Sequence, residues 1–362
     1  MIELHQRPQN WLTKLWNLPR VLEGTRVQRH DPCGFCQSRD AETLAAVDYW
    51  DLSENKIVKC LNCGQMQLDP MLTREQMELG CKAWYIDQQI HTDIHGQKKG
   101  FKGAFRRGVA FAVLLKKKKI FPRTMLELGA GDGYFARGLQ YVFPQLKVTC
   151  VDIVPEVMDY LENHHGFSTI RAELESLNAQ EHGTYDLVVA RDVLEHTSQP
   201  MTVFKNIHQV LNSDGYFHMV SPNGFEDMWG FYARNQLSKK PAELLINHVS
   251  YFDPYSLKLL LKPYFDFETW CIQDLKGVLK RGVGRAVIAE VACAPSIKRS
   301  VQKTLEQETQ LNQLLSITPE EVLKTPSGYA MWADFKENKR LTLNADTGVG
   351  RNIFALLRRT HQ

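Results

Sequence analysis

Short apolar runs alternate with helical stretches from Thr124 onward, and a Gly, Asp or Pro follows each run closely. The runs are Met125–Leu128, Lys147–Val151, Leu187–Ala190 and Tyr216–Val220. Apolar runs of this length, bounded by turn residues and separated by helices, are typical of buried parallel strands. The pattern predicts an α/β fold with a central, mostly parallel sheet. Phe265–Ile272 and Ala286–Ala292 are expected as later strands.

The rest of the chain differs in composition and in the secondary structure that it predicts. Residues 30–70 are rich in turn residues and cysteines. Residues 71–121 are expected to be mostly helical, since Thr73 to Gln76 provide a helix start, and a polar helix is expected at 296–315. We predict five segments: an N-terminal segment at 1–29, a four-cysteine module at 30–80, a helical basic connector at 81–121, the α/β domain at 122–296 and a helical C-terminal extension at 297–362.

A glycine-rich turn follows the first predicted strand. It reads Glu127-Leu128-Gly129-Ala130-Gly131-Asp132-Gly133-Tyr134 and leads into a predicted helix. Glycines at alternate positions allow a sharp turn and a close approach of ligand to backbone. A nicotinamide or flavin site would require a third glycine where Tyr134 stands. Packing of the turn against the helix is the structural alternative.

Acidic residues stand at the ends of the next two strands. Asp152 closes the second strand, where a carboxylate accepts hydrogen bonds from the ribose hydroxyls of a nucleoside. Its structural alternative is to cap the helix after Pro155. Glu173 stands where a third strand should end. We expect it, or a neighbouring backbone amide, near the adenine of such a ligand, and an exposed loop acid is the alternative.

The region around the fourth strand resembles a known family. It reads Asp186-Leu187-Val188-Val189-Ala190-Arg191-Asp192-Val193-Leu194-Glu195-His196, and the next helix leads to Leu211-Asn212-Ser213-Asp214-Gly215. With the glycine turn and Asp152, these runs resemble, in order, the motifs of class I S-adenosylmethionine-dependent methyltransferases over about residues 120–295. Asp214 departs from the pattern, because it replaces the first glycine of the family's turn before the fifth strand.

The resemblance implies a Rossmann-like methyltransferase domain with S-adenosylmethionine as cofactor. By this resemblance, Gly129, Gly131 and Gly133 would contact the methionine and ribose parts, and Asp152 would bind the ribose. Glu173 would lie near the adenine, and Glu127 would anchor the glycine loop or the amino group. Arg191 and Asp192 would flank the sulfonium and the acceptor.

Two histidines are candidates for deprotonating the acceptor, because imidazole titrates near neutral pH. His248 lies in Asn247-His248-Val249-Ser250-Tyr251-Phe252, which is similar to a His-x-x-x-Phe element of the family. We expect a neutral His248 to be the general base and His196 to order the loop after the fourth strand. Structural hydrogen bonding is the alternative for both. Residues 224–247 are expected to form part of a lid in which Trp229, Phe231, Tyr232 and Arg234 line an acceptor pocket or pack on the sheet.

Four cysteines form two C-x-x-C pairs. Cys33 and Cys36 make the first pair, and Cys60 and Cys63 make the second. Four thiolates suit tetrahedral Zn²⁺ and leave no position for water, so the pattern predicts a structural zinc ion in a zinc-ribbon-like module. A redox centre or accidental pairing is the alternative.

The order of a four-cysteine module, Leu68-Asp69-Pro70, Trp84-Tyr85 and the methyltransferase-like region resembles bacterial enzymes that methylate nucleotide-linked sugars or surface polysaccharide components. This resemblance implies a small-molecule acceptor, which would be anionic if it is a nucleotide-sugar. The competing hypothesis is an RNA-modifying or nucleic-acid-binding protein. Its contacts would be the zinc module and the basic stretch at 98–123, where Phe101, Phe105 and Phe111 lie among lysines and arginines.

Composition constrains these hypotheses only weakly. Hydrophobic residues make up 43% and charged residues 23% of the 362 positions, as in ordinary globular proteins, and a formal charge of +3 does not itself favour nucleic acid or membrane. Residues 1–29 contain no apolar segment typical of a signal peptide, and no apolar stretch is long enough for a membrane span. With the paired cysteines, this favours a reducing, cytoplasmic location.

Overall fold

The computed structural model describes residues 20–21, 25–47, 55–77, 99–224, 227, 248–273 and 352–361. Several expectations lie outside these residues: the strand at 286–292, the helix at 296–315, most of the predicted lid, and most of the N-terminal segment. Residues 74–77 are helical, as expected.

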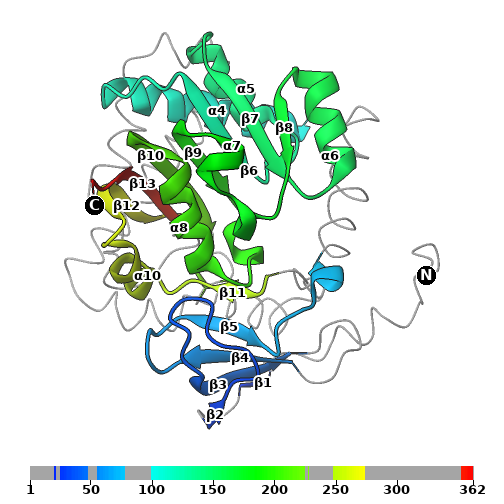
Figure 1. Ribbon diagram of the computed structural model, residues 1–362, viewed down its shortest axis with the longest axis vertical. Coiled ribbons are helices and arrows are strands. Elements are labelled where there is room, and N and C mark those ends of the chain that lie inside the picture. The colour runs from blue at the N-terminus through cyan, green and yellow to red at the C-terminus, as the bar shows by residue number, and fades with distance from the viewer. Residues whose placement is uncertain are drawn as a thin grey trace.

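A seven-stranded sheet forms the larger part of the protein (Figure 1). Its strand order is β12-β13-β10-β9-β6-β7-β8. The strands, in chain order, are β6 (Thr124–Leu128), β7 (Lys147–Asp152), β8 (Ser168–Arg171), β9 (Tyr185–Arg191), β10 (Leu211–Pro222), β12 (Phe265–Gln273) and β13 (Asn352–Arg359). The pairs from β8 to β10 are all parallel. The predicted Rossmann-like α/β fold with a mostly parallel sheet is therefore confirmed.

The strand β13 corrects the expectation of a helical C-terminal extension. Residues 352–359 lie between β10 and β12 and run antiparallel to both. Ile353, Phe354, Ala355, Leu356 and Leu357 are buried in the two cores on either side of the sheet. These residues belong to the central sheet because a fully apolar strand needs cover on both faces.

Helices cover both faces of this sheet. One core contains α4 (Lys99–Lys117), α5 (Tyr134–Val142) and α6 (Pro155–Tyr160). The other contains α8 (Pro200–Val210) and α10 (Pro254–Leu261). Shorter elements are the π-helical turn η2 (Leu161–His165), the 3-10 turns η3 (Leu174–Ser176) and η4 (Leu194–His196), and α7 (Ala179–His182).

Helix α4 contains most of the basic stretch at 98–123, and its middle is buried. Every residue from Val109 to Leu115 is buried. The Phe111 ring stacks on His218 with centroids 4.0 Å apart, and Phe105 packs edge-on against Tyr141. These two aromatics therefore face the protein core and do not form the exposed stacking surface expected of an RNA contact.

A second, six-stranded sheet lies at one end of the molecule (Figure 1). Its strands are β1 (Arg20–Val21), β2 (Arg26–Gln28), β3 (Asp40–Val47), β4 (Asn55–Cys60), β5 (Met66–Asp69) and β11 (Ser250–Tyr251). The β3–β4 hairpin fills the gap between the two cysteine pairs. Strand β11 was not expected. It comes from the segment after β10 and pairs antiparallel with β5, so the two sheets are joined by the chain itself.

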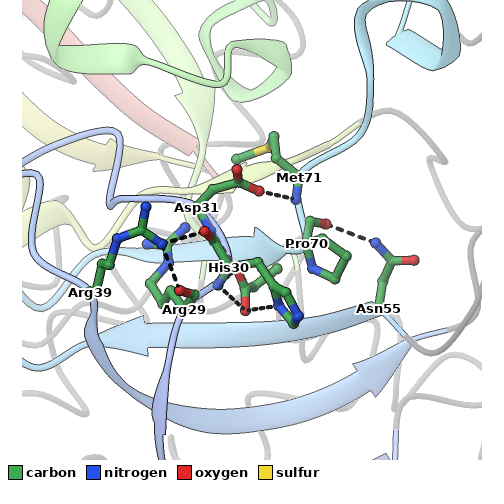
Figure 2. A network of polar contacts seen from close by, with 8 residues as sticks. Arg29, His30, Asp31, Arg39, Asn55, Pro70 and Met71 are labelled. Carbon is green, nitrogen blue, oxygen red and sulfur yellow. Dashed lines mark hydrogen bonds and ion pairs between the residues drawn. The ribbon is translucent and has the colours of Figure 1, made fainter.

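Polar contacts hold the loop at 29–31 against the end of β5 (Figure 2). The backbone N–H of His30 donates to Asp69 at 3.0 Å, and the backbone N–H of Met71 donates to Asp31 at 3.0 Å. Arg39 donates to the carbonyl oxygens of Arg29 and His30. This loop leads directly to Cys33, so the network fixes the position of the first cysteine pair.

Among the described residues, no helix is long and apolar enough to cross a membrane.

Candidate active site

The carboxyl ends of five parallel strands bring most of the predicted site residues together, because parallel strands all end at the same edge of a sheet. The register aligns Leu128 of β6 with Val151 of β7 and Ala190 of β9, and it aligns Asp152 with Arg171 of β8. The glycine turn, Asp152, Glu173, Arg191 and Asp192 therefore follow neighbouring strands.

The glycine turn has the backbone conformation that its sequence predicts. Gly129, Gly131 and Gly133 all have left-handed φ values, of 59°, 55° and 70°. A side chain at Gly129 would lie 2.7 Å from Val193, so the turn also packs closely on the segment after β9. Both the ligand-binding and the packing interpretations require glycine here.

Glu127 lies in β6, two residues before this turn, and its carboxylate is buried. It is 3% exposed, and Oε2 has no hydrogen-bond partner within the described part of the chain. Burial raises its pKa to about 8, against the opposing attraction of Arg191. An unsatisfied buried carboxylate oxygen is costly and marks a place where a cationic or N–H donor group would bind favourably.

Asp152 is buried at the end of β7, and its Oδ1 accepts a hydrogen bond of 2.9 Å from the backbone N–H of Val154. Asp152 does not cap the helix after Pro155, because the N-cap of α6 is Val154 and receives no side-chain hydrogen bond. Its carboxylate instead holds the turn before α6. Burial raises its pKa to about 6.

Glu173 follows β8 and forms an ion pair with Arg74, with Oε1 2.7 Å from Nε. The carboxylate expected near the adenine thus contacts the N-terminal module. Sequence reasoning did not identify Arg74, whose approach to Glu173 depends on how the two sheets pack.

Arg191 and Asp192 follow β9 in different environments. The Arg191 guanidinium lies over the Phe135 ring, 4.5 Å from its centroid, and burial lowers its pKa to about 10. It therefore stays charged at neutral pH. Asp192 is exposed and has a left-handed φ of 52°, which is uncommon outside glycine and often found at functional sites.

The two candidate histidines lie next to one another. The rings of His196 and His248 have centroids 4.8 Å apart. His248 Nδ1 lies 2.7 Å from Asp227 Oδ2, and His248 Nε2 lies 3.9 Å from Glu195 Oε1. Neither Glu195 nor Asp227 was predicted as a site residue.

The charges around His248 conflict with the expected neutral base. Burial alone would lower its pKa, but Asp227, Glu195 and Asp192 outweigh burial and raise it to about 9. Without a cation at Nε2, His248 therefore carries its proton at neutral pH, and the three carboxyl groups are the reason.

The four predicted metal-binding cysteines come together at the start and end of the β3–β4 hairpin. Their sulfur atoms all lie within 4.8 Å of one another, with Cys33 3.7 Å from Cys63 and Cys36 3.5 Å from Cys60. Two sulfurs bound to one tetrahedral Zn²⁺ at about 2.3 Å would be about 3.8 Å apart, so the geometry fits a zinc ion.

Comparison with known proteins identifies the larger unit. Residues 100–271 match the sequence model of a family described as "Methyltransferase domain". This region is an S-adenosylmethionine-dependent methyltransferase domain. The match begins within α4 and ends within β12, so it contains the whole carboxyl edge described above. The methyltransferase domain also takes β13, which lies beyond the match, into its sheet.

Curated relatives match the methyltransferase domain over part of their length. A malonyl-[acyl-carrier protein] O-methyltransferase of Legionella pneumophila is 26% identical over 120 residues, which cover 32% of this chain and 42% of that protein. A ubiquinone biosynthesis O-methyltransferase of Vibrio parahaemolyticus is 23% identical over 156 residues, covering 41% of this chain and 66% of that protein. This chain thus spans less than two thirds of the length of either relative.

Solved structures are also similar to the chain. The plantazolicin methyltransferase BpumL, in complex with a monoazolic desmethylPZN analog and SAH, aligns with a TM-score of 0.46 and 13% identity, over 79% of this chain and 96% of that one.

Proposed function

We propose that this chain transfers the methyl group of S-adenosylmethionine to an oxygen atom of a small-molecule acceptor. The observation that carries the proposal is the buried carboxylate oxygen of Glu127, which has no hydrogen-bond partner among the described residues and belongs to the strand that leads into three left-handed glycines. The cofactor's amino group is a cationic donor of the kind that this oxygen lacks, and the three glycines allow the sharp backbone turn that follows the strand.

In this proposal, each of the other residues at the sheet edge contacts a different part of the cofactor. Asp152 binds the ribose hydroxyls, since its carboxylate stands at the end of the second strand. The loop at Glu173 lies beside the adenine, with Arg74 holding the carboxylate in place. Arg191 suits the methionine carboxylate, because a guanidinium recognises carboxylates.

The acceptor would bind beside Asp192, His196 and His248, on the side of the sheet edge where the carboxylates gather. Bound S-adenosylmethionine supplies an electrophilic methyl group on its sulfonium. The acceptor oxygen would gain this methyl group as the bond from the methyl carbon to sulfur breaks, which leaves S-adenosylhomocysteine, and the oxygen would lose its proton to solvent. The protein aligns the two reactants and excludes water.

Two observations guide the choice of acceptor class. The relatives above are named O-methyltransferases, which supports oxygen as the accepting atom. The cysteine module followed by the methyltransferase domain resembles enzymes that act on nucleotide-linked sugars, so these are the acceptors to test first.

We also propose that Cys33, Cys36, Cys60 and Cys63 hold a structural zinc ion. The support is the mutual proximity of the four sulfur atoms. Such an ion would fix the module on which Arg74 and β5 depend.

Calorimetric titration of the full chain with S-adenosylhomocysteine tests the cofactor assignment, and one site per chain is expected. Transfer of a labelled methyl group to nucleotide-sugars, with an acyl carrier protein and a phenol as comparison acceptors, tests the acceptor class. A folded chain that does not bind S-adenosylhomocysteine would refute the proposal. Labelling of only a comparison acceptor would refute the proposal that the acceptor is a nucleotide-linked sugar.

A further inference from the structure

Three potential metal ligands meet at the edge of the methyltransferase domain, apart from the cysteines. Glu195 and His196 belong to the turn η4, and His248 directly precedes Val249 and β11. The backbone N–H of Val249 donates to the Glu195 carbonyl oxygen at 2.9 Å, which ties the two segments together. One ligand atom from each of the three side chains lies within 4.8 Å of the other two.

Glu195 has the character of a ligand rather than of a core residue. It is 1% exposed, and its Oε2 accepts a hydrogen bond of 2.7 Å from Ser221. Its Oε1 is buried and lacks a hydrogen-bond partner among the described residues. Leaving a carboxylate oxygen in this state costs stability unless a cation satisfies it.

His248 is oriented toward this oxygen by Asp227. The contact between Nδ1 and Asp227 directs Nε2 to Glu195 Oε1. Their separation of 3.9 Å is too long for a hydrogen bond, but a cation about 2.1 Å from each atom would bridge it. A carboxylate on the far nitrogen of a histidine is the usual outer partner of a metal-binding imidazole.

The donor set indicates which kind of cation fits. Two imidazoles and one carboxylate suit divalent transition metals and leave other coordination positions open. His196 is the most exposed of the three residues, and Asp192, which acts electrostatically on Glu195 and His248, is exposed. Glu195 itself, Asp227 on His248 and the neighbouring Asp192 provide carboxyl groups around this site, which favours a divalent cation.

We propose that Glu195, His196 and His248 bind a divalent transition-metal ion, with Asp227 as the positioning residue for His248. The metal site itself is independent of the acceptor. Its role rests on the proposed function: an acceptor oxygen on the metal loses its proton more readily, so no neutral histidine is needed as the base.

Mn²⁺ is a suitable probe because it prefers nitrogen and oxygen ligands to thiolates, so its binding reports on this site and not on the four cysteines. Electron paramagnetic resonance measures free Mn²⁺ in a titration of the chelator-treated full chain. One bound Mn²⁺ per chain is expected. Glu195→Gln keeps an oxygen that accepts the hydrogen bond from Ser221 but loses the carboxylate, so it should abolish Mn²⁺ binding. Asp227→Asn should weaken Mn²⁺ binding by about 10- to 100-fold.

One control variant should bind Mn²⁺ as the wild type does: His208→Gln, at a half-buried histidine of α8 outside the cluster. Calorimetry with S-adenosylhomocysteine, run on every variant, shows whether the fold is kept. Wild-type chain that binds S-adenosylhomocysteine but leaves Mn²⁺ free would overturn the inference, as would unchanged Mn²⁺ binding in Glu195→Gln. Mn²⁺ binding without S-adenosylhomocysteine binding would instead refute the proposed function alone.

Discussion

At the scale of single residues, the charge of Asp152 offers the sharpest test of the cofactor site. Asp152→Asn keeps an oxygen that accepts the Val154 N–H, so the local turn should persist. Loss of the charge should weaken S-adenosylhomocysteine binding by about 1.5–3 kcal/mol, which is roughly 10- to 150-fold in Kd. Calorimetry measures this, and circular dichroism checks the fold. An unchanged Kd would show that Asp152 only holds the turn.

The raised pKa of Asp152 also predicts how this binding depends on pH. Burial raises the pKa from 3.8 to about 6. Because the ionised carboxylate is the better ribose acceptor, the Kd of wild-type chain should rise as the pH falls below 6, by up to about tenfold per unit. The dependence should be absent in Asp152→Asn. The stability of the fold should depend on pH in the opposite direction. The folded chain holds this proton more tightly than the unfolded chain, so Asp152 contributes stability that is lost as the pH rises from 3.8 to about 6.

At the scale of elements, the crossing of α4 and α5 depends on two glycines. A methyl group on Gly138 would lie 2.2 Å from the Phe105 carbonyl oxygen, and one on Gly108 would lie 2.1 Å from that of Phe135. Gly138→Ala should therefore destabilise the chain by about 1–3 kcal/mol, although alanine favours helices. Arg137→Ala, on the exposed side of α5, should stay within about 0.5 kcal/mol. Denaturant titration compares them, and a stabilised Gly138→Ala would contradict the packing.

Much of the sheet, but not all of it, could be predicted at this scale. All five tested strand predictions coincide with strands, because apolar runs between turn residues are a local signal. Strand β13 was missed although Ile353–Leu357 is an apolar run, since its insertion between β10 and β12 is a long-range pairing. Glu195 and Asp227 were missed for a similar reason. Only the return of the chain to β11 brings His248 to them.

At the scale of the whole molecule, the N-terminal module and the methyltransferase domain share a core. Cys33, Phe35 and Cys60 pack in the same cluster as residues of β9, β10 and α8. The carbonyl oxygen of Gly34 accepts from Met201, and Leu68 donates to Val249. The module is thus a packed part of the structure, and its proposed metal should matter for the stability of the whole chain.

Cys60→Ser should release the zinc ion and lower the melting temperature, because three thiolates do not complete the tetrahedral site. Elemental analysis should find zinc in the wild type and in Cys150→Ala, a buried cysteine outside the cluster. Residues 25–77 should become the first to be cut by protease in Cys60→Ser. Wild-type chain purified without zinc or iron would rule out the metal.

The place of β13 in the sheet has a consequence during synthesis on the ribosome. Strand β12 pairs with β13 and not with β10, so its edge and that of β10 stay unpaired until residues 352–359 emerge. At 5–20 residues per second, this delay after β12 lasts roughly 4–16 s. Two unpaired strand edges in a nascent chain are prone to pair with other chains and aggregate, so this protein should depend on chaperones that bind ribosome-attached chains.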